Sequence, residues 1–181
     1  MKILKITFLV ITVLAVIVIA FLAYAGMFTK IAVVEKEMGG FVVAGKDVTG
    51  PYMNVGPAMC SVDSTLKANG VMCTRGFGIY YDNPNSVAPE KCRSFVGNIL
   101  DTADSATLIK IKAAGLRIDS VAKKMSVVID YPSPNNMSYM IGPMKAYPAL
   151  NKYITEKKIA PVLSLEIYDV PAKKTYYVMQ Y

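Results

Sequence analysis

Hydrophobic residues dominate one long uncharged run near the start of the chain and form shorter, alternating runs after it. Residues 6–28 carry no charge. A helix over them is about 34 Å long at about 1.5 Å per residue, which is enough to cross the hydrocarbon core of a bilayer. We therefore expect a transmembrane anchor over residues 1–28 and one domain over residues 29–181.

A cleaved signal peptide is the alternative explanation for this hydrophobic run. Lys2 and Lys5 form a basic N-terminal region, and Ala23-Tyr24-Ala25 has the small residues of a cleavage site. The uncharged run before this site is longer than the ~7–15 residues usual in a signal peptide, which favours the anchor.

Lysines flank the expected span on both sides and decide its orientation only weakly. Two lie before the span, and Lys30, Lys36 and Lys46 follow it. Because positive residues favour the cytoplasmic side, this near balance gives a slight preference for a single-pass protein with its domain on the extracytoplasmic side.

After the anchor, runs rich in β-branched residues alternate with turn signals. Residues 30–37 and 40–47 are two such runs around Gly39, a pattern typical of a hairpin. From Pro57 onward, hydrophobic residues recur at helical spacing until Asn69. The remaining strands expected in this first unit lie at 77–81 and 93–100.

The second half of the chain repeats this order of elements. Its helix is expected to begin near Pro148, because Pro143 and Pro148 would both interrupt a longer helix, whereas proline is well tolerated in a first turn. Residues 101–115 connect the two units. The other expected elements are strands at 116–121 and 124–131, a helix end near Lys158, and strands at 162–168 and 175–181.

Two short motifs occur in both units and indicate an internal repeat. Tyr-Met-Asn-Val-Gly-Pro at 52–57 is similar to Tyr-Met-Ile-Gly-Pro at 139–143. Further along each unit, Gly-Ile-Tyr at 78–80 corresponds to Glu-Ile-Tyr at 166–168. The spacing between the two motifs is similar in both units, so we interpret them as copies of one supersecondary unit.

The repeat predicts the fold class. We expect an α+β fold of duplicated β-β-α-β-β units, about 31–100 and 116–181, which form a pseudo-twofold antiparallel sheet with two helices on one face. The transmembrane helix precedes these units. The sharpest difference between equivalent positions is Gly78 in the first unit against Glu166 in the second.

Composition narrows the function only a little. The chain has 20 Lys and Arg against 13 Asp and Glu, a net charge of +7 that is spread along the sequence. Such a diffuse charge is more typical of a basic face beside an anionic membrane than of nucleic-acid binding. The three cysteines have no Cys-X-X-Cys spacing, so we expect structural thiols, with Cys60 and Cys92 in the core.

Glu166 is the main candidate for a binding residue. Because side chains alternate along a strand, we expect Leu165 and Ile167 to face the helices, and Glu166 and Tyr168 to lie on the opposite, concave face. A buried carboxylate among aromatic residues is costly unless a cation pairs with it, so this position suits a cation-binding pocket. The alternative is a solvated glutamate on an open sheet.

Four tyrosines and a glycine accompany this glutamate in the expected ligand site. Gly78 leaves room for a ligand, and Tyr80 and Tyr168 offer π-faces to a flat or cationic molecule. Tyr52 and Tyr139, near the starts of the two helices, are candidates for the rim. The alternative is that these tyrosines are ordinary packing residues, as most tyrosines in strands are.

The residues for common catalytic chemistry are missing from the sequence. With no histidine, the chain lacks the commonest general base and any Cys-His or Ser-His pair. No carboxylate cluster has the character of a metal site. We therefore expect no metal and no cofactor, and we expect a binding protein before an enzyme.

Three sequence elements together resemble the GyrI-like small-molecule-binding family, which also supplies the effector-binding domain of AraC-type and MerR-type regulators. They are Gly50-Pro51-Tyr52, Gly78-Ile79-Tyr80-Tyr81-Asp82-Asn83-Pro84 and Glu166-Ile167-Tyr168. The resemblance covers residues from about 31 to 181. It implies a pocket between the two units for bulky, hydrophobic and often cationic ligands, with Glu166 as the counter-charge.

The chain also departs from the family pattern. It has no tryptophan, and it reads Asp169-Val170-Pro171 where Asn-Asp-Pro is more usual, so the identity of the ligand stays open. A single span before such a domain, with no DNA-binding helix-turn-helix, is similar in arrangement to the testis-expressed ER-phagy receptor without its C-terminal tail. This arrangement gives no reason to expect a nucleic-acid partner.

The resemblance leaves three functions open. The first is a membrane-anchored module that binds a small hydrophobic or cationic molecule. Some GyrI-like proteins are hydrolases of reactive small molecules, and this second function would use Glu166 with Tyr168 or Tyr80. The third is a membrane-tethered domain that docks a protein partner, which the sequence does not identify.

Overall fold

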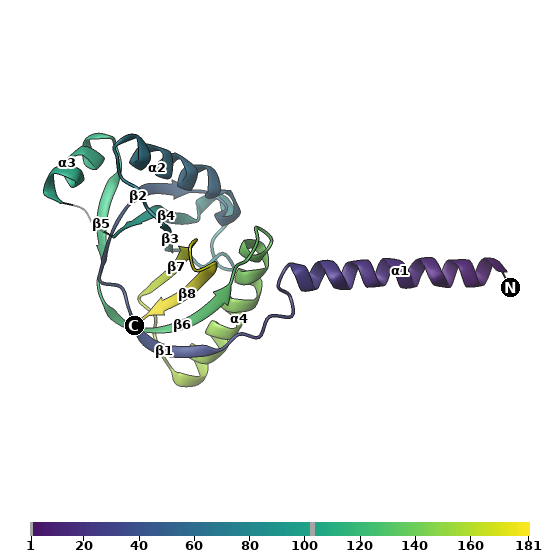
Figure 1. The fold of residues 1–181 in the computed structure, drawn as a ribbon. Coiled ribbons are helices and arrows are strands. Elements are labelled where there is room, and N and C mark those ends of the chain that lie inside the picture. Colours follow the sequence, from purple (N-terminus) through teal and green to yellow (C-terminus); the bar gives the residue numbers. More distant parts are fainter. Residues whose placement is uncertain (1, 102–103) are drawn as a thin grey trace.

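Eight strands form one antiparallel sheet in the order β1-β6-β8-β7-β3-β4-β2-β5 (Figure 1). The computed structural model describes residues 2–101 and 104–181. The strands are β1 (Val33–Met38), β2 (Phe41–Thr49), β3 (Arg75–Tyr80), β4 (Arg93–Leu100), β5 (Arg117–Val121), β6 (Lys124–Pro132), β7 (Leu163–Asp169) and β8 (Lys174–Gln180). The α-helices are α1 (Lys2–Tyr24), α2 (Gly56–Ala68), α3 (Ser105–Ala113) and α4 (Ser138–Lys157), with short 3-10 turns at Tyr52–Asn54 and Pro89–Lys91.

The strand order has an approximate twofold axis between β7 and β3. β8, β6 and β1 follow on one side, and β4, β2 and β5 follow on the other. Each unit keeps its last three strands in its own half of the sheet and gives its first strand to the other half, since β1 pairs with β6 and β5 pairs with β2. The duplicated α+β fold is therefore confirmed, with an exchange of first strands between the units.

The expected hairpin of residues 30–37 and 40–47 is wrong. β1 pairs with β6, and β2 pairs with β4 and β5, so β1 and β2 do not pair with each other. Gly39 and Gly40 lie between them with φ of 109° and 80°. The two glycines bend the chain at this point and do not reverse it, so the first strand continues toward the other half of the sheet.

The bend keeps one continuous antiparallel register with the second unit. Met38 lies opposite Lys124 in β6, and Phe41 lies opposite Val121 in β5, so the pairing continues across the glycines without a shift. Gln180 supports this crossing, because its buried side-chain amide donates to one backbone carbonyl of each segment at 2.8 and 3.1 Å. We call this region the strand crossing.

The strand crossing brings the two edges of the sheet together. Because β1 continues into β2 and β5 continues into β6, the sheet curls around an interior of its own (Figure 1). Hydrophobic side chains from strands β2 to β8 fill this inner face. They are Val43, Phe77, Ile79, Phe95, Ile99, Val121, Val128, Leu165, Ile167 and Val178.

The three helices of the domain lie on the outer face of the curled sheet (Figure 1). α4 packs on β6 and β8 through Ala146 and Leu150. α2 and α3 pack on the other half of the sheet through residues that include Leu66 and Ile111. The core of the domain is therefore divided into one cluster inside the curled sheet and two clusters between the sheet and its helices.

This arrangement reverses the expected faces of β7. Leu165 and Ile167 do not meet the helices, because they belong to the cluster inside the curled sheet. Glu166 points to the opposite side, where α4 covers the sheet. The expectation of a concave face that carries Glu166 is therefore wrong, because the concave side is closed on itself and filled with hydrophobic residues.

α4 begins at Ser138 and contains both prolines, so its expected start near Pro148 is wrong. A proline within a helix costs about 3 kcal/mol because it removes a hydrogen bond. Packing on the sheet offsets this cost, since the buried residues follow every fourth position across both prolines. These residues are Ser138, Gly142, Ala146 and Leu150.

The connector between the repeats contains a helix, and one of the two cysteines expected in the core is exposed. The connector contains α3, whose first turn is capped by Asp104 through a hydrogen bond from the backbone N–H of Thr107 at 2.7 Å. Cys92 is buried as expected. The expected core position of Cys60 is wrong, because α2 buries Val62 and leaves Cys60 exposed.

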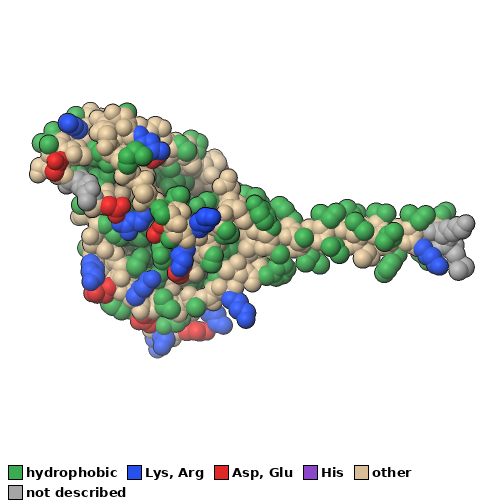
Figure 2. All heavy atoms as spheres, viewed as in Figure 1, with side chains coloured by type: hydrophobic (Ala, Val, Ile, Leu, Met, Phe, Trp, Pro, Cys, Tyr) green, Lys and Arg blue, Asp and Glu red, His purple; other side chains and the backbone are tan. Residues whose placement is uncertain are grey.

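α1 extends away from the domain as a single exposed helix (Figures 1 and 2). Its segment Ile3–Tyr24 has a mean hydropathy of 3.1 and is long and apolar enough, by length and composition, to cross a membrane. None of its most hydrophobic window is buried in the domain.

Replacing Gly39 by alanine is expected to destabilise the fold more than replacing Gly40. Both positions have positive φ, so each alanine costs about 1 kcal/mol in backbone strain. At Gly39 a Cβ atom would also collide with the backbone carbonyl of Ala122, whereas at Gly40 the nearest atom is the Lys123 Cβ at 3.6 Å. We expect Gly39→Ala to lower the free energy of unfolding by about 2 kcal/mol more than Gly40→Ala.

The measurement is chemical denaturation of the full chain in detergent micelles, with both variants compared with the unsubstituted chain. Equal losses for the two variants would show that close backbone approach at the strand crossing does not stabilise the sheet.

Candidate functional site

Glu166 lies at the centre of the sheet, on the outer face between the two repeats. It is in β7, directly opposite Gly78 of β3, so the two positions that differ most between the repeats are neighbours at the twofold axis. Only 5% of the Glu166 surface is exposed. The alternative of a solvated glutamate is therefore wrong.

Two tyrosine hydroxyls hold the Glu166 carboxylate. Tyr147 of α4 donates to Oε1 at 2.7 Å, and Tyr168 of β7 donates to Oε2 at 2.6 Å. The Tyr80 hydroxyl lies 3.0 Å from that of Tyr168. Because the single proton of the Tyr168 hydroxyl is given to the carboxylate, Tyr80 must be the donor to Tyr168. The network therefore links the glutamate to both repeats.

Tyrosine rings enclose this network. Tyr177 of β8 lies directly opposite Glu166 in the sheet, and its ring meets that of Tyr147 edge to face, with ring centroids 5.8 Å apart. We call Tyr80, Tyr147, Tyr168 and Tyr177 the tyrosine cage. Edge-to-face contacts of this kind hold the rings in defined positions.

The two expected rim tyrosines lie on either side of the cage. Tyr52 meets Tyr80 edge to face at 4.8 Å, and Tyr139 meets Tyr168 at 5.8 Å. The Tyr52 hydroxyl points away from the glutamate and holds the chain after β3, since it donates to the carbonyl oxygen of Asp82 at 2.8 Å and accepts from its N–H at 2.9 Å. Tyr52 thus borders the cage with its ring alone.

Two glycines make room for the cage. A Cβ atom at Gly78 would lie 2.7 Å from the Tyr80 hydroxyl oxygen, so the space expected there for a ligand is occupied by the Tyr80 side chain. A Cβ atom at Gly142 of α4 would collide with the Tyr177 hydroxyl oxygen. That hydroxyl is buried and has no hydrogen-bond partner among the described residues, which costs about 1–3 kcal/mol for a buried polar group.

The charge of Glu166 has no compensating cation in the part of the chain that the structure describes. Among the described residues, no lysine or arginine forms an ion pair with it. Burial raises the pKa of the Glu166 carboxyl, and the hydrogen bonds from Tyr147 and Tyr168 offset part of this rise. The pKa of each cage tyrosine is raised, mainly by burial and secondly by the negative charge of Glu166. These tyrosines therefore stay protonated at neutral pH.

The structure brings all six sequence-predicted residues together and adds three that sequence reasoning missed. The added residues are Tyr147, Tyr177 and Gly142. Tyr147 was missed because the expected helix start at Pro148 placed it outside the helix. Gly142 belongs to the repeated Gly-Pro motif, so that motif was a signal for the site, whereas nothing in the sequence distinguishes Tyr177 from a packing residue.

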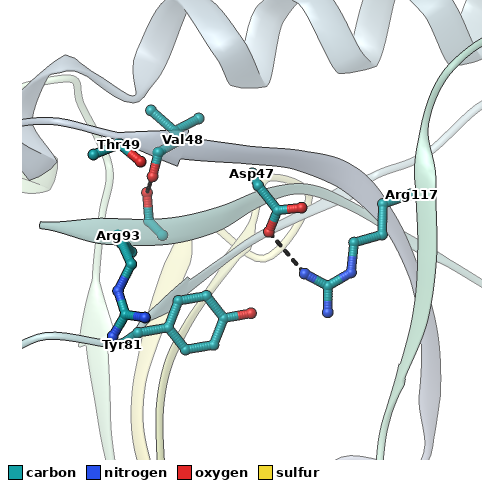
Figure 3. Close-up of a pocket in the computed structure, with 7 residues that line it drawn as sticks. Asp47, Val48, Thr49, Tyr81, Arg93 and Arg117 are labelled. Carbon is teal, nitrogen blue, oxygen red and sulfur yellow. Dashed lines mark hydrogen bonds and ion pairs between the residues drawn. The ribbon is translucent and has the colours of Figure 1, made fainter.

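Two surface hollows lie away from the tyrosine cage. The larger, about 360 Å³, is lined by residues that include Asp47, Tyr81, Arg93 and Arg117 (Figure 3). Both of its arginines are already paired, Arg117 with Asp47 at 2.7 Å and Arg93 with Asp82 at 2.8 Å. These pairs leave no uncompensated charge to attract an ionic ligand.

The smaller hollow, about 280 Å³, lies beside β1 and includes the hydrophobic residues Met38, Phe41 and Tyr176. Lys36 covers this side with its ammonium group 5.2 Å from the centre of the Tyr176 ring. Neither hollow contains a buried, uncompensated charge, so Glu166 and the tyrosine cage remain the candidate site. Within the described ranges, no group of three His, Cys, Asp or Glu residues is placed to hold a metal ion.

The fold of this chain is shared with solved structures of a DNA-associated protein. The C-terminal domain of EcmrR matches with a TM-score of 0.55 and 15% identity, over 83% of this chain and 96% of that one. An EcmrR–DNA complex matches with a TM-score of 0.56 and 14% identity, over 98% of this chain and 68% of that one. At such identities the likeness concerns the fold alone, which is consistent with a GyrI-like domain.

Two curated relatives match this chain in sequence over most of its length. The chain is 33% identical over 159 residues to Testis-expressed protein 264 homolog of Mus musculus, which covers 82% of this chain and 49% of that protein. It is 31% identical over 166 residues to Testis-expressed protein 264 of Homo sapiens, which covers 84% and 50%. The chain thus spans about half the length of these relatives. No protein-family model matches it.

Burial of Glu166 predicts a particular pH dependence of stability. Its pKa in the folded chain is raised above the ordinary value of 4.5, so the folded state keeps this proton where the unfolded state has lost it. Stability should therefore fall as the pH rises through and above about 4.5, by at most about 1.4 kcal/mol per pH unit. Glu166→Gln removes this contribution.

We expect the free energy of unfolding of the unsubstituted chain, minus that of Glu166→Gln, to decrease from pH 4.5 toward neutral pH. Denaturation of both chains in detergent micelles at a series of pH values measures this difference, in which other titrating groups cancel. A difference that stays constant with pH would show that burial does not disfavour the charged carboxylate.

Proposed function

We propose that this chain is a membrane-anchored module that binds small hydrophobic cations at Glu166, in the seam between its two repeats. The observation that carries the proposal is a buried carboxylate that has two hydroxyl donors but no ion-pair partner among the described residues. The fold also supports the proposal. It is consistent with the GyrI-like family that the sequence resembles, and that resemblance implies a pocket for such ligands between the two units.

The chemistry of the tyrosine cage favours a cation over an anion or a neutral polar ligand. An ionised carboxylate in an apolar site costs several kcal/mol unless a positive charge lies next to it. The rings that surround Glu166 add π-faces, each worth about 0.5–2 kcal/mol to a cation. A ligand with a positive centre and an apolar body would satisfy both the carboxylate and the rings.

A ligand would enter by displacing side chains at the rim. Tyr139 is 36% exposed, and its ring covers Tyr168 from the outside. The edge-to-face contact between them is worth only about 0.5–1.5 kcal/mol, so rotation of these rings is an inexpensive way to open the cage. A bound cation would then replace the Tyr168 hydroxyl as the partner of one carboxylate oxygen.

The membrane part of the proposal depends on α1. The helix is exposed along its whole hydrophobic window and is long enough to span a bilayer. An exposed apolar helix of this length is unfavourable in water and is stabilised by lipid. We propose that α1 is the anchor, which would keep the binding domain at a membrane surface.

Binding of phenyltrimethylammonium to the full chain in lipid nanodiscs tests the function. We expect Glu166→Gln to weaken this cation at least about tenfold, equivalent to about 1.4 kcal/mol, because the counter-charge is lost while the hydrogen-bonding shape is kept. Isothermal titration calorimetry measures the affinity. tert-Butylbenzene, the uncharged isostere, should bind the two chains equally.

Glu35→Gln is a matched control. Glu35 also accepts hydrogen bonds from two tyrosines, Tyr153 at 2.8 Å and Tyr181 at 2.7 Å, but it is exposed. Its replacement should leave the affinity for the cation unchanged. If Glu166→Gln bound phenyltrimethylammonium as tightly as the unsubstituted chain, Glu166 would not be the counter-charge and the proposed function would fail.

A further inference from the structure

We infer that the domain rests on the bilayer through one apolar face beside the end of α1, made of Phe28, Tyr139, Met140 and Met144. We call these four residues the basal face. The inference rests on the proposed anchoring of α1 in a membrane, and it is independent of ligand binding at Glu166.

The segment that joins α1 to the domain is held by side chains of the domain. Asn135 donates its side-chain amide to the carbonyl oxygen of Tyr24 at 2.8 Å, and the Tyr131 hydroxyl donates to that of Gly26 at 3.0 Å. Ala25, between these two residues, is fully buried. The end of the helix is therefore packed against the domain and does not act as a free linker.

Lys145 of α4 holds the next residues of the same segment. Its ammonium group donates to the carbonyl oxygens of Met27 at 2.6 Å and Thr29 at 2.5 Å. Together with the contacts of Asn135 and Tyr131, these bonds satisfy four carbonyl groups that follow one another closely along the chain. A segment with so many directed contacts fixes the orientation of the domain relative to α1.

The length of α1 leaves no space between the domain and the membrane surface. The apolar segment Ile3–Tyr24 has 22 residues, about 33 Å of helix, against a hydrocarbon core about 30 Å thick. Tyr24 therefore lies at the interface, where aromatic side chains are favoured. Phe28 follows four residues later and is 62% exposed, so the first residues of the domain are at headgroup level.

The exposed positions of α4 change in character along the helix. Near the anchor they are apolar, with Met140 53% and Met144 66% exposed. The exposed residues farther along are mostly polar or charged: Asn151, Lys152, Thr155, Glu156 and Lys157. Figure 2 shows that hydrophobic side chains continue from α1 onto the adjoining end of the domain. A helix that lay wholly in water would gain nothing from apolar residues at this end alone, whereas insertion into the interface stabilises them.

The basal face also borders the candidate site. Tyr139 belongs to this face, and its ring packs against Tyr168 of the tyrosine cage. The rim of the cage would therefore lie at the membrane surface, where an amphiphilic cation is concentrated.

Single tryptophans introduced into this tryptophan-free chain test the inference. Met144→Trp reports on the basal face. Met72→Trp is the matched control, because Met72 is 76% exposed and follows the far end of α2. In vesicles of brominated phosphatidylcholine, Met144→Trp should lose at least about half of its emission and shift to shorter wavelength, as expected for a side chain in the interface. Met72→Trp should show little change.

A third variant, Leu14→Trp, reports on the middle of α1 and distinguishes failure of the basal face from failure of the anchor. If Leu14→Trp is quenched but Met144→Trp behaves like Met72→Trp, the basal face is not inserted and the inference is overturned while the anchor stands. Equal, strong quenching of Met72→Trp and Met144→Trp would also overturn it, because the domain would then lie on lipid without this orientation. If Leu14→Trp is not quenched, α1 is not a membrane anchor. That result does not depend on whether phenyltrimethylammonium binds at Glu166.

Discussion

The continuous pairing of residues 33–45 with residues 117–129 is the interaction on which the rest of the structure depends. It crosses from one half of the sheet to the other at Gly39 and Gly40, where a Cβ atom at the first glycine would strike the backbone of the opposite strand. Because this pairing joins the two edges, the sheet must curl, and its concave side becomes a closed apolar interior. The helices of the domain, and the polar side chains of the candidate site, then lie on the outer face.

The position of Glu166 follows from this constraint. A carboxylate in the middle of β7 cannot face the closed interior, so it faces α4. There two tyrosines of the second repeat donate to it, and Tyr80 of the first repeat donates to one of them. The exchange of first strands makes neither repeat a separate folding unit, and the twofold axis passes beside the glutamate. Glu166, a charge in one repeat where the other has a glycine, is thus buried where the two copies meet.

The anchor and the site are connected through one helix. α4 supplies Tyr147 to the carboxylate and Lys145 to the segment that follows α1, two residues apart. The two prolines in this helix are tolerated because a stripe of small and apolar residues packs continuously on the sheet. Any movement of α4 that opened the tyrosine cage would therefore also act on the contacts that orient the domain at the membrane.

The sequence by itself determined the internal repeat, the order of the strands and of the helices other than α3, the apolar first helix, and the identity of Glu166 as an unusual residue, because these depend on local periodicity and on comparing one half of the chain with the other. It did not determine which strands pair, since a Gly-Gly bend within a long strand has the same local signal as a hairpin. It also did not reveal Tyr147, because the penalty for proline in a helix is local, whereas the packing that outweighs it comes from residues distant in the chain. The burial of Glu166 was decided only by the tertiary structure, because curling of the sheet chooses which of two alternating faces is covered by α4.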